Sequence, residues 1–180
     1  QSRSSAASDV YKRQDINTGI MVSDAAVNIK PSEKTLKTVT ETMVKSLKLL
    51  GIKTPKIAFL SASELVMENM ESTVLAQNLK EWAKENIRDA FFSGPLALDL
   101  IISREAALKK GLENDPVVGQ SDGIVVPEIV SGNTLYKSLV YFAGGCAAGI
   151  VLGAKVPVLL TSRADPPEAR LASIALASIL

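Results

Sequence analysis

The stretch between residues 161 and 168 holds side chains that could bind an anion. Ser162 and Arg163 offer a hydroxyl and a forked guanidinium. Asp165 and Glu168 follow, with two prolines between them. Asp is a favoured helix N-cap, Pro fits the first helical position, and an acidic residue three positions after the cap has the capping-box spacing. A helix is therefore predicted to begin at Asp165, and its exposed N–H groups beside Arg163 favour an anion.

The alternative is an ordinary strand-to-helix turn with a surface arginine, and the pattern leaves both interpretations open. Residues 156–161 form an apolar run, which predicts a buried strand before the turn. Residues 169–180 are apolar nearly all round, which predicts a buried helix after it.

Composition limits the possible chemistry. The chain has 180 residues, 47% of them hydrophobic and 22% charged, as expected for one globular domain. A net charge of +1 gives no electrostatic reason to expect nucleic acid or a membrane as partner. The single cysteine, Cys146, excludes an internal disulfide and is expected in the core. Histidine is absent, so no Ser-His or Cys-His pair exists and any proton transfer must use carboxylates, lysine, tyrosine or the substrate.

Residues 1–14 differ from the rest of the chain. They show no apolar period and no hydrophobic segment of the kind found in signal peptides. They resemble a translated vector or adapter scar, so we treat them as an artefactual or disordered leader. We expect a cytoplasmic protein.

The remaining residues alternate between apolar runs and amphipathic segments. Strands are predicted at 19–22, 56–61, 89–93, 123–126 and 156–161. Helices are predicted at 31–50, 72–86, 103–110, from Gly132 or Asn133 onward, and at 169–180. Such alternation predicts an α/β fold with a largely parallel sheet flanked by helices. In these sheets ligands bind at the carboxyl ends of the strands.

Two further strand ends carry polar or turn residues. The candidate binding residues there are Gly94, Pro95 and Asp99 after one strand and Gly132, Asn133 and Lys137 after another. Asn133 and Lys137 would lie one turn apart on one helix face and could meet one ligand. The alternative is a helix start followed by a surface lysine. The glycines at 145, 149 and 153 would form one smooth face of a helix, and neither a G-x-G-x-x-G nor a P-loop motif supports nucleotide binding.

Several segments, taken in order, resemble the phosphate acetyl/butyryltransferase family, and the match covers nearly all of residues 15–180. They are GPLALD at 94–99, ISREAA at 102–107, PVVGQSD at 116–122, SGNTLYK at 131–137 and LTSRADPPEARLASIAL at 160–176. The form of the first and last segments is more similar to the phosphate butyryltransferase branch.

This resemblance implies a reversible transfer of a short acyl group between CoA and phosphate, with no metal and no bound cofactor. It places Ser162 and Arg163 in a cleft near phosphate and the CoA thiol. Ser162 would donate to an oxyanion or to phosphate, and Arg163 would neutralise phosphate. Asp165 and Glu168 are both candidates for the base that takes the thiol proton, and the two alternatives stay open.

The resemblance also implies a two-domain fold like that of isocitrate and isopropylmalate dehydrogenases. Family members are about twice as long, so residues 15–149 would be the second domain and residues 150–180 a return segment into an absent N-terminal domain. The fragment should then be poorly active alone and expose apolar surface on its last helix. The full-length protein is expected to be a homo-oligomer. The alternative functions are phosphate acetyltransferase and a non-catalytic acyl-CoA- or anion-binding domain.

Overall fold

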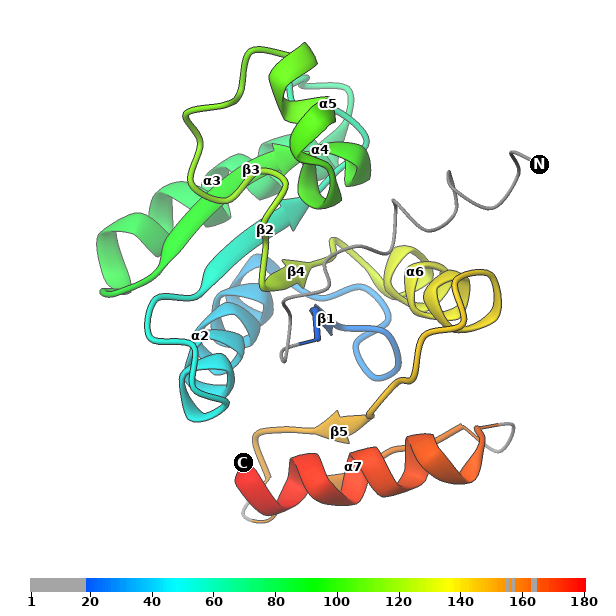
Figure 1. Cartoon of the computed structure of the whole chain (residues 1–180). Coiled ribbons are helices and arrows are strands. Elements are labelled where there is room, and N and C mark those ends of the chain that lie inside the picture. The colour runs from blue at the N-terminus through cyan, green and yellow to red at the C-terminus, as the bar shows by residue number, and fades with distance from the viewer. Residues whose placement is uncertain (1–18, 155, 157, 163–164) are drawn as a thin grey trace, which may run out of the picture.

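The computed structural model describes residues 19–154, 156, 158–162 and 165–180, and its elements alternate between strand and helix (Figure 1). The strands are β1 (Met21–Ser23), β2 (Lys56–Leu60), β3 (Phe91–Leu96), β4 (Gly123–Val125), β5 (Ile150–Val151) and β6 (Val158–Leu159). The helices are α2 (Glu33–Leu49), α3 (Glu71–Asn86), α4 (Leu98–Ile102), α5 (Arg104–Lys109), α6 (Ile129–Tyr141) and α7 (Pro167–Ile179).

Four strands form a parallel sheet in the order β1-β4-β2-β3. The central strand β2 has neighbours on both sides, with Ile57 opposite Gly123 of β4 and Phe92 of β3. Ile57, Ala58 and Phe59 are at most 1% exposed. Continuous apolar runs of this kind are typical of strands covered on both faces. The predicted α/β fold with a parallel sheet flanked by helices is confirmed.

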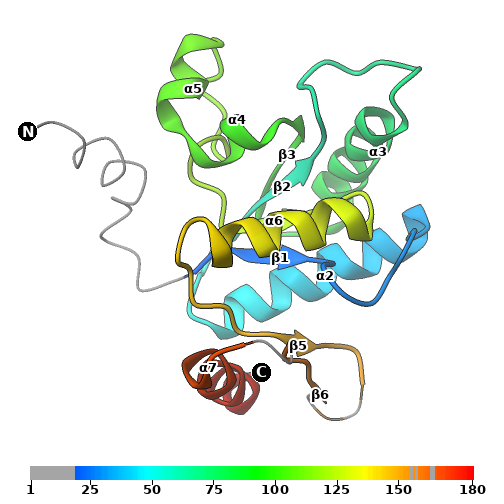
Figure 2. The same cartoon turned by 90° about the vertical axis from the view of Figure 1, so that its right-hand side faces the viewer.

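Helices cover both faces of this sheet. Ile57 and Phe59 of β2 pack in one core cluster with α2 and α3. Ala58 points the other way, as alternate residues of a strand do, into a second cluster with α4, α5 and α6. Figure 2 shows α6 and α2 on opposite sides of β1. The molecule is therefore a three-layer α/β/α sandwich over residues 21–141.

Local signals in the sequence account for α2. The Ser32 hydroxyl accepts a hydrogen bond from the N–H of Thr35 at 3.1 Å and caps the first turn. Leu36, Met43 and Leu47 keep a helical period and are buried against the sheet. Gly51 follows the last turn with φ of 95°, a left-handed conformation that glycine adopts without a side-chain clash.

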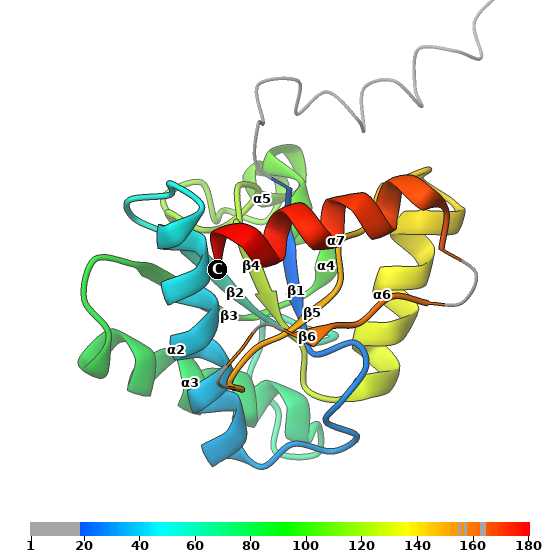
Figure 3. The ribbon, with the colours of Figure 1, turned by 90° about the horizontal axis from the view of Figure 1, so that it is seen from below.

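The last described residues form a small unit outside the four-stranded sheet. Among the residues that the structure describes, β5 and β6 pair with each other alone, antiparallel, with Ile150 opposite Leu159. The N–H of Gly149 donates to the Ser173 hydroxyl at 3.0 Å, which ties α7 to the start of β5. The β5–β6–α7 unit lies beyond the β1 edge of the sheet (Figure 1), and α7 crosses the underside of the molecule from α6 toward α2 (Figure 3).

Two predictions of burial are wrong in this unit. The strand predicted at 156–161 is limited to Val158 and Leu159, each 44% exposed. The helix predicted to be buried exposes 68% of Leu171 and 55% of Ile174. The physical reason for this exposure is that, over the described residues, β6 has one strand neighbour and α7 packs mainly against β5 and β6. The exposed apolar surface that the resemblance implied for the last helix is present.

The glycine-rich segment also differs from its prediction. Residues 144–149 are not helical, so their glycines do not form a helix face. A side chain at Gly149 would overlap the carbonyl oxygen of Leu160, which lies beside it through the β5–β6 pairing. Cys146 is exposed rather than part of the core.

Candidate functional site

The helix α6 carries three of the predicted binding residues and begins earlier than expected. Glu128, not Gly132 or Asn133, is its N-cap, and its carboxylate accepts hydrogen bonds at 2.7 Å from the N–H groups of Val130 and Ser131. Hydrogen bonds from Ser131 and Val130 hold the pKa of Glu128 below its ordinary value. Gly132 and Asn133 therefore lie within the first turns of the helix.

Gly132 and Asn133 contact the loop that follows β1. Gly132 is buried, and a side chain there would overlap the backbone carbonyl oxygen of Asp24. The Asn133 side-chain amide donates to the carbonyl oxygen of Ala25 at 3.1 Å. These two residues thus dock the start of α6 on the carboxyl end of β1, which is a positioning function that their motif alone did not reveal.

The Asp24 carboxylate organises that loop. One oxygen accepts from the N–H groups of Ala26 at 2.8 Å and Val27 at 3.0 Å, and the other from the N–H of Asn28 at 2.7 Å. Burial raises the pKa of Asp24, but the hydrogen bonds from Ala26, Asn28 and Val27 outweigh it and hold this pKa below its ordinary value. Sequence reasoning missed Asp24, although an Asp directly after an apolar run is a known turn signal.

The second half of α6 reaches the turn between β6 and α7. The Tyr136 phenol donates to Oδ1 of Asp165 at 3.1 Å, and Oδ2 of the same carboxylate accepts from the N–H of Ser162 at 2.6 Å. The N–H of Asp165 returns a hydrogen bond to the carbonyl of Ser162 at 3.0 Å. Ser162 and Asp165 were predicted site residues, and the structure brings them together.

Asp165 does not cap α7 as predicted. The N-cap position belongs to Pro166, which has no side-chain hydrogen bond to offer, and Pro167 begins the helix. The carboxylate of Asp165 faces back toward Ser162 and α6 instead of toward the N–H groups of α7. The Asp165 carboxylate therefore holds the backbone of Ser162 in place instead of capping α7.

Tyr136 is the residue of this site that sequence reasoning did not single out. Burial raises the pKa of the Tyr136 phenol, and the hydrogen bond to Asp165 and the charge of that carboxylate raise it further. The available signal was its place in the 131–137 motif, one turn after Gly132, together with the tendency of a partly buried tyrosine to find a partner for its hydroxyl.

Lys137 lies beside two aromatic rings of the same helix. Its ammonium stands 5.5 Å from the ring centre of Tyr136 and 5.8 Å from that of Tyr141. Both distances allow a cation–π attraction, so the rings help to fix a positive charge next to the Tyr136 contact.

The remaining predicted residues are divided between other places. Arg163 lies outside the described residues. Glu168 is exposed in the first turn of α7. Gly94 and Pro95 are buried within β3, where a side chain at Gly94 would come within 2.7 Å of Phe59 Cβ. Asp99 is on α4 and pairs with Lys110 at 3.5 Å.

Gly94, Pro95 and Asp99 lie at the β3 edge of the sheet, whereas α6 lies at the β1 edge. Two strands separate β3 from β1. At about 4.8 Å between neighbouring strands, the two edges are about 14 Å apart. The structure therefore joins the 131–137 and 162–165 motifs directly and leaves the 94–99 motif at a distance that only an extended ligand could bridge.

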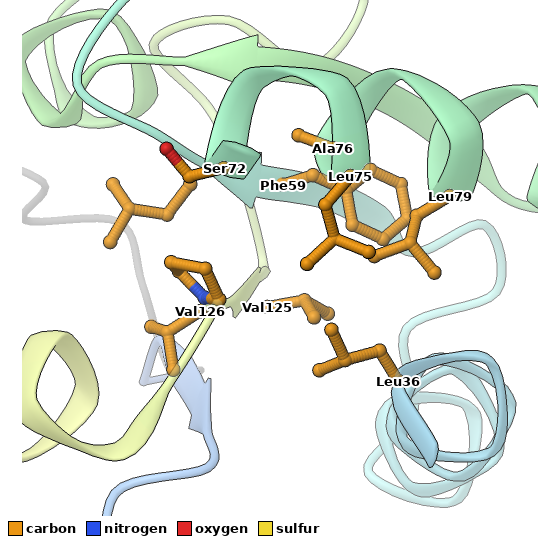
Figure 4. A pocket seen from close by; sticks show the side chains of 10 residues that line it. Leu36, Phe59, Ser72, Leu75, Ala76, Leu79, Val125 and Val126 are labelled. Atoms are coloured by element: carbon orange, nitrogen blue, oxygen red, sulfur yellow. The ribbon is translucent and has the colours of Figure 1, made fainter. Parts of the chain in front are cut away.

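A small cavity lies between α2, α3 and the ends of β2 and β4 (Figure 4). Its walls are apolar apart from the Ser72 hydroxyl, which is hydrogen-bonded to Ser61 at 2.8 Å. The lining residues are Leu36, Phe59, Leu60, Ser72, Leu75, Ala76, Leu79, Val125, Val126 and Pro127. None is charged and none is a predicted site residue, so the cavity has no group to hold an anion.

Over the described ranges, no helix is long and apolar enough to cross a membrane. The α6 site joins a carboxylate that accepts from two donors, one of them the Ser162 N–H, with a lysine beside two aromatic rings. Such a set can orient a polar or anionic substrate and move a proton without histidine.

Comparison with known proteins agrees with this arrangement. The family model for phosphate acetyl/butaryl transferase matches residues 3–178. A probable phosphate butyryltransferase from Bacillus subtilis is 43% identical over 93% of this chain and 56% of its own length, and a phosphate acetyltransferase from Thermotoga maritima is 37% identical over 94% and 58%.

Among solved structures, a branched-chain phosphotransacylase from Enterococcus faecalis V583 superposes with a TM-score of 0.82 at 40% identity, covering 88% of this chain and 56% of that one. The chain thus spans a little over half the length of these relatives. By the match along almost its entire length, the chain belongs to the phosphate acetyl/butaryl transferase family.

Proposed function

We propose that the protein containing this chain transfers a short-chain acyl group between CoA and inorganic phosphate, with butyryl-CoA preferred over acetyl-CoA. The observation that carries this proposal is the ordered turn at Ser162 and Asp165, held by Tyr136 of α6. Family membership and the names of the relatives, which include butyryl-, acetyl- and branched-chain enzymes, support the class of reaction.

The reaction exchanges one bond to the acyl carbon for another. A phosphate oxygen attacks the thioester carbonyl carbon, the C–S bond breaks, and CoA leaves as a thiolate that takes up a proton. In the reverse direction a carboxylate removes the thiol proton, the sulfur attacks the acyl phosphate, and phosphate leaves. A thiol pKa near 8.5 lets a nearby carboxylate assist without histidine.

The proposed roles follow the chemistry of the side chains. Ser162 donates a hydrogen bond to the developing oxyanion or to phosphate, and Arg163 neutralises the phosphate charge. Asp165 or Glu168 exchanges a proton with the thiol. Ser162, Arg163 and Asp165 come between β6 and α7 in the sequence and Glu168 is in the first turn of α7, so one short segment would hold the reacting groups.

CoA is long enough to reach both edges of the sheet. We propose that its reactive end lies by α6, near Asn133 and Lys137, and that the rest extends along the carboxyl ends of the strands toward Asp99. In this arrangement the buried glycines at 94 and 132 are structural, because Phe59 fills the space beside the first and the Asp24 carbonyl the space beside the second. Acyl-CoA and phosphate are then the only small molecules the proposal requires.

The exposed face of α7 supports a proposal about the longer protein. Residues 15–149 would form one domain of a two-domain fold of the isocitrate dehydrogenase type, and residues 150–180 would complete a second, N-terminal domain. Val158, Leu159 and Leu171 are exposed in this chain, and apolar side chains clustered on a strand and a helix usually have a covering partner. The complete protein is proposed to be a homo-oligomer, as the resemblance implied.

The experiment uses the complete reading frame that contains this chain. Thiol release is followed with butyryl-CoA, isobutyryl-CoA and acetyl-CoA, with and without phosphate. We expect phosphate-dependent release that is fastest with butyryl-CoA and is lost in Arg163→Ala. Faster release from acetyl-CoA would assign the protein to the acetyl branch. CoA binding without release from any substrate would replace the proposal with a binding domain.

A further inference from the structure

We propose that Tyr136 is a positioning residue for acyl transfer, which acts through Asp165 to fix the turn at Ser162, and that Asp165 itself takes no proton. This inference rests on the function proposed above and assigns the roles within its site. It begins from the two hydrogen bonds that occupy the two oxygens of Asp165, one from the Tyr136 phenol and one from the Ser162 N–H.

The Tyr136 phenol links the turn at Ser162 to helix α6. Ser162 and Asp165 come between β6 and α7 in the sequence, and β6 pairs outside the four-stranded sheet. Tyr136 belongs to α6, which packs on the sheet through Leu135 and through the contact of Gly132 with Asp24. The hydrogen bond from Tyr136 to Asp165 therefore connects the turn at Ser162 to α6, a helix that is itself packed on the sheet.

Asp165 in turn fixes the backbone of Ser162. Asp165 accepts from the N–H of Ser162 and donates its own N–H to the carbonyl of the same residue. The backbone of Ser162 is thereby held at both of its polar groups. If the hydroxyl of Ser162 must meet an oxyanion, an error of about 1 Å in its position can lower the rate about 100-fold.

The hydrogen bonds of Asp165 also bear on the proton transfer. A carboxylate acting as base must aim a lone pair at the thiol, and one of the two lone pairs on each oxygen of Asp165 already accepts from an internal donor that holds the carboxylate toward Ser162 and α6. Glu168 is exposed three positions later, in the first turn of α7. Of the two candidate carboxylates, Glu168 is thus the exposed one, and the proposal assigns the proton transfer to it.

Tyr136→Phe tests the positioning role because it removes one oxygen and keeps the ring that contacts Lys137. In the complete reading frame we expect kcat to fall about 10- to 100-fold, the effect of losing one hydrogen bond to a charged group at a site that needs precise geometry, with KM for acyl-CoA and phosphate within about twofold of the unsubstituted protein. The matched control is Tyr141→Phe, the same change on the same helix at a residue 62% exposed, which keeps the ring beside Lys137 and should lower kcat far less than Tyr136→Phe does.

Two further readouts separate positioning from other roles. In the NMR spectrum of this chain, the Ser162 amide proton should exchange with solvent faster in Tyr136→Phe than in Tyr141→Phe. In the pH profile of kcat/KM for CoA and acyl phosphate, Glu168→Gln should abolish the limb that rises from acid pH, while Asp165→Asn should lower the rate and keep that limb.

The outcomes are distinct. Unchanged kcat and unchanged Ser162 exchange in Tyr136→Phe would overturn the positioning role, and loss of the acid limb in Asp165→Asn but not in Glu168→Gln would overturn the assignment of the base. An unsubstituted protein without phosphate-dependent thiol release would instead remove the proposed function, and the inference with it. The assay of the unsubstituted protein detects the failure of the proposed function before any variant is compared.

Discussion

The backbone carbonyl of Asp24 occupies the space that a side chain at Gly132 would need. The contact joins the loop after β1 to the first turn of α6, two segments that are about a hundred residues apart in sequence. Asn133 adds a hydrogen bond to the same loop, at the carbonyl oxygen of Ala25. The position of α6, and with it that of Tyr136 and Lys137, depends on this close approach.

We expect Gly132→Ala to lower the free energy of unfolding by about 1–3 kcal/mol, the usual effect of forcing an added methyl group into a packed contact. The nearest opposing atoms, the carbonyl oxygen and carbon of Asp24, are backbone, so they cannot move aside as a flexible side chain would. Denaturant unfolding of this chain measures the change. Gly19→Ala is the matched control, since no atom lies within 4 Å of a side chain added there, and equal losses in both variants would contradict the contact.

A second prediction concerns the pH dependence of the β1 loop. Asp24 has a pKa below its ordinary value of 3.8, because hydrogen bonds from Ala26, Asn28 and Val27 favour its charged form. Its contribution to stability is therefore fully present above the ordinary pKa and is lost as the pH falls below about 4. Asp24→Asn should lower the unfolding free energy by about 1–2 kcal/mol at pH 7, since an amide cannot accept at both positions.

The measurement is denaturant unfolding of both proteins between pH 7 and pH 2.5. The gap between their unfolding free energies should narrow as the pH falls, because the acid form of Asp24 loses the same hydrogen bonds. Glu85→Gln, at an exposed position near the end of α3, serves as control and should change stability by less than about 0.5 kcal/mol. A gap of constant size would show that the carboxylate is not the group responsible.

The sequence was sufficient for the four-stranded sheet because its signals are local. The apolar run around Ile57 and Phe59 needs cover on both faces, and the segment before Gly51 keeps a helical period with a cap at each end. Each of these features depends on residues within one element. The parallel order then follows from the helices that separate consecutive strands.

The sequence was insufficient where a contact depends on distant residues. The apolar run at Val158 and Leu159 has the composition of a buried strand, yet each residue is 44% exposed and β5 is the strand neighbour of β6 among the described residues. The start of α6 was missed because Glu is an unusual N-cap and Glu128 lies four positions before the expected Gly132.

The candidate site shows the same division. Ser162 and Asp165 were assigned to one site from a local pattern, but their hydrogen bond was not predicted from the sequence. Tyr136 is 29 residues before Asp165, and no pattern in either motif says that the phenol meets that carboxylate. The prediction that Asp165 caps α7 was wrong for the same reason. The distant Tyr136 phenol donates to the side chain that would otherwise cap the helix.

A third prediction follows from the Tyr136 phenol. Its pKa lies above the ordinary value of 10.0 because of burial, reinforced by the hydrogen bond and charge of Asp165. Asp165→Asn should lower this pKa without restoring the ordinary value, since burial remains. Two-dimensional NMR of ring-labelled tyrosine follows Tyr136 separately from the exposed Tyr141, and an unchanged titration of Tyr136 would contradict the contact.

The sign of the accompanying stability change is opposite to that of Asp24. A tyrosine whose pKa is raised by folding contributes stability that is fully present below the unfolded value and is lost as the pH rises through the folded one. The unfolding free energy should therefore decline above about pH 10, and less steeply in Tyr136→Phe, which has no proton to lose. Tyr141→Phe should decline as the unsubstituted chain does.

The final prediction concerns the apolar face of α7, where Leu171 is 68% exposed and Ile174 is 55% exposed. In this chain alone, Leu171→Gln should reduce the fluorescence of an apolar-surface dye and change the unfolding free energy by less than about 0.5 kcal/mol, as at most exposed positions. In the complete reading frame the same change should destabilise by about 1–3 kcal/mol, because a covered glutamine would lack hydrogen-bond partners. Arg170→Gln, one position earlier and already polar, should have little effect in either protein. If Leu171→Gln is equally harmless in both, the face stays open in the complete protein, and the proposed N-terminal domain does not cover α7.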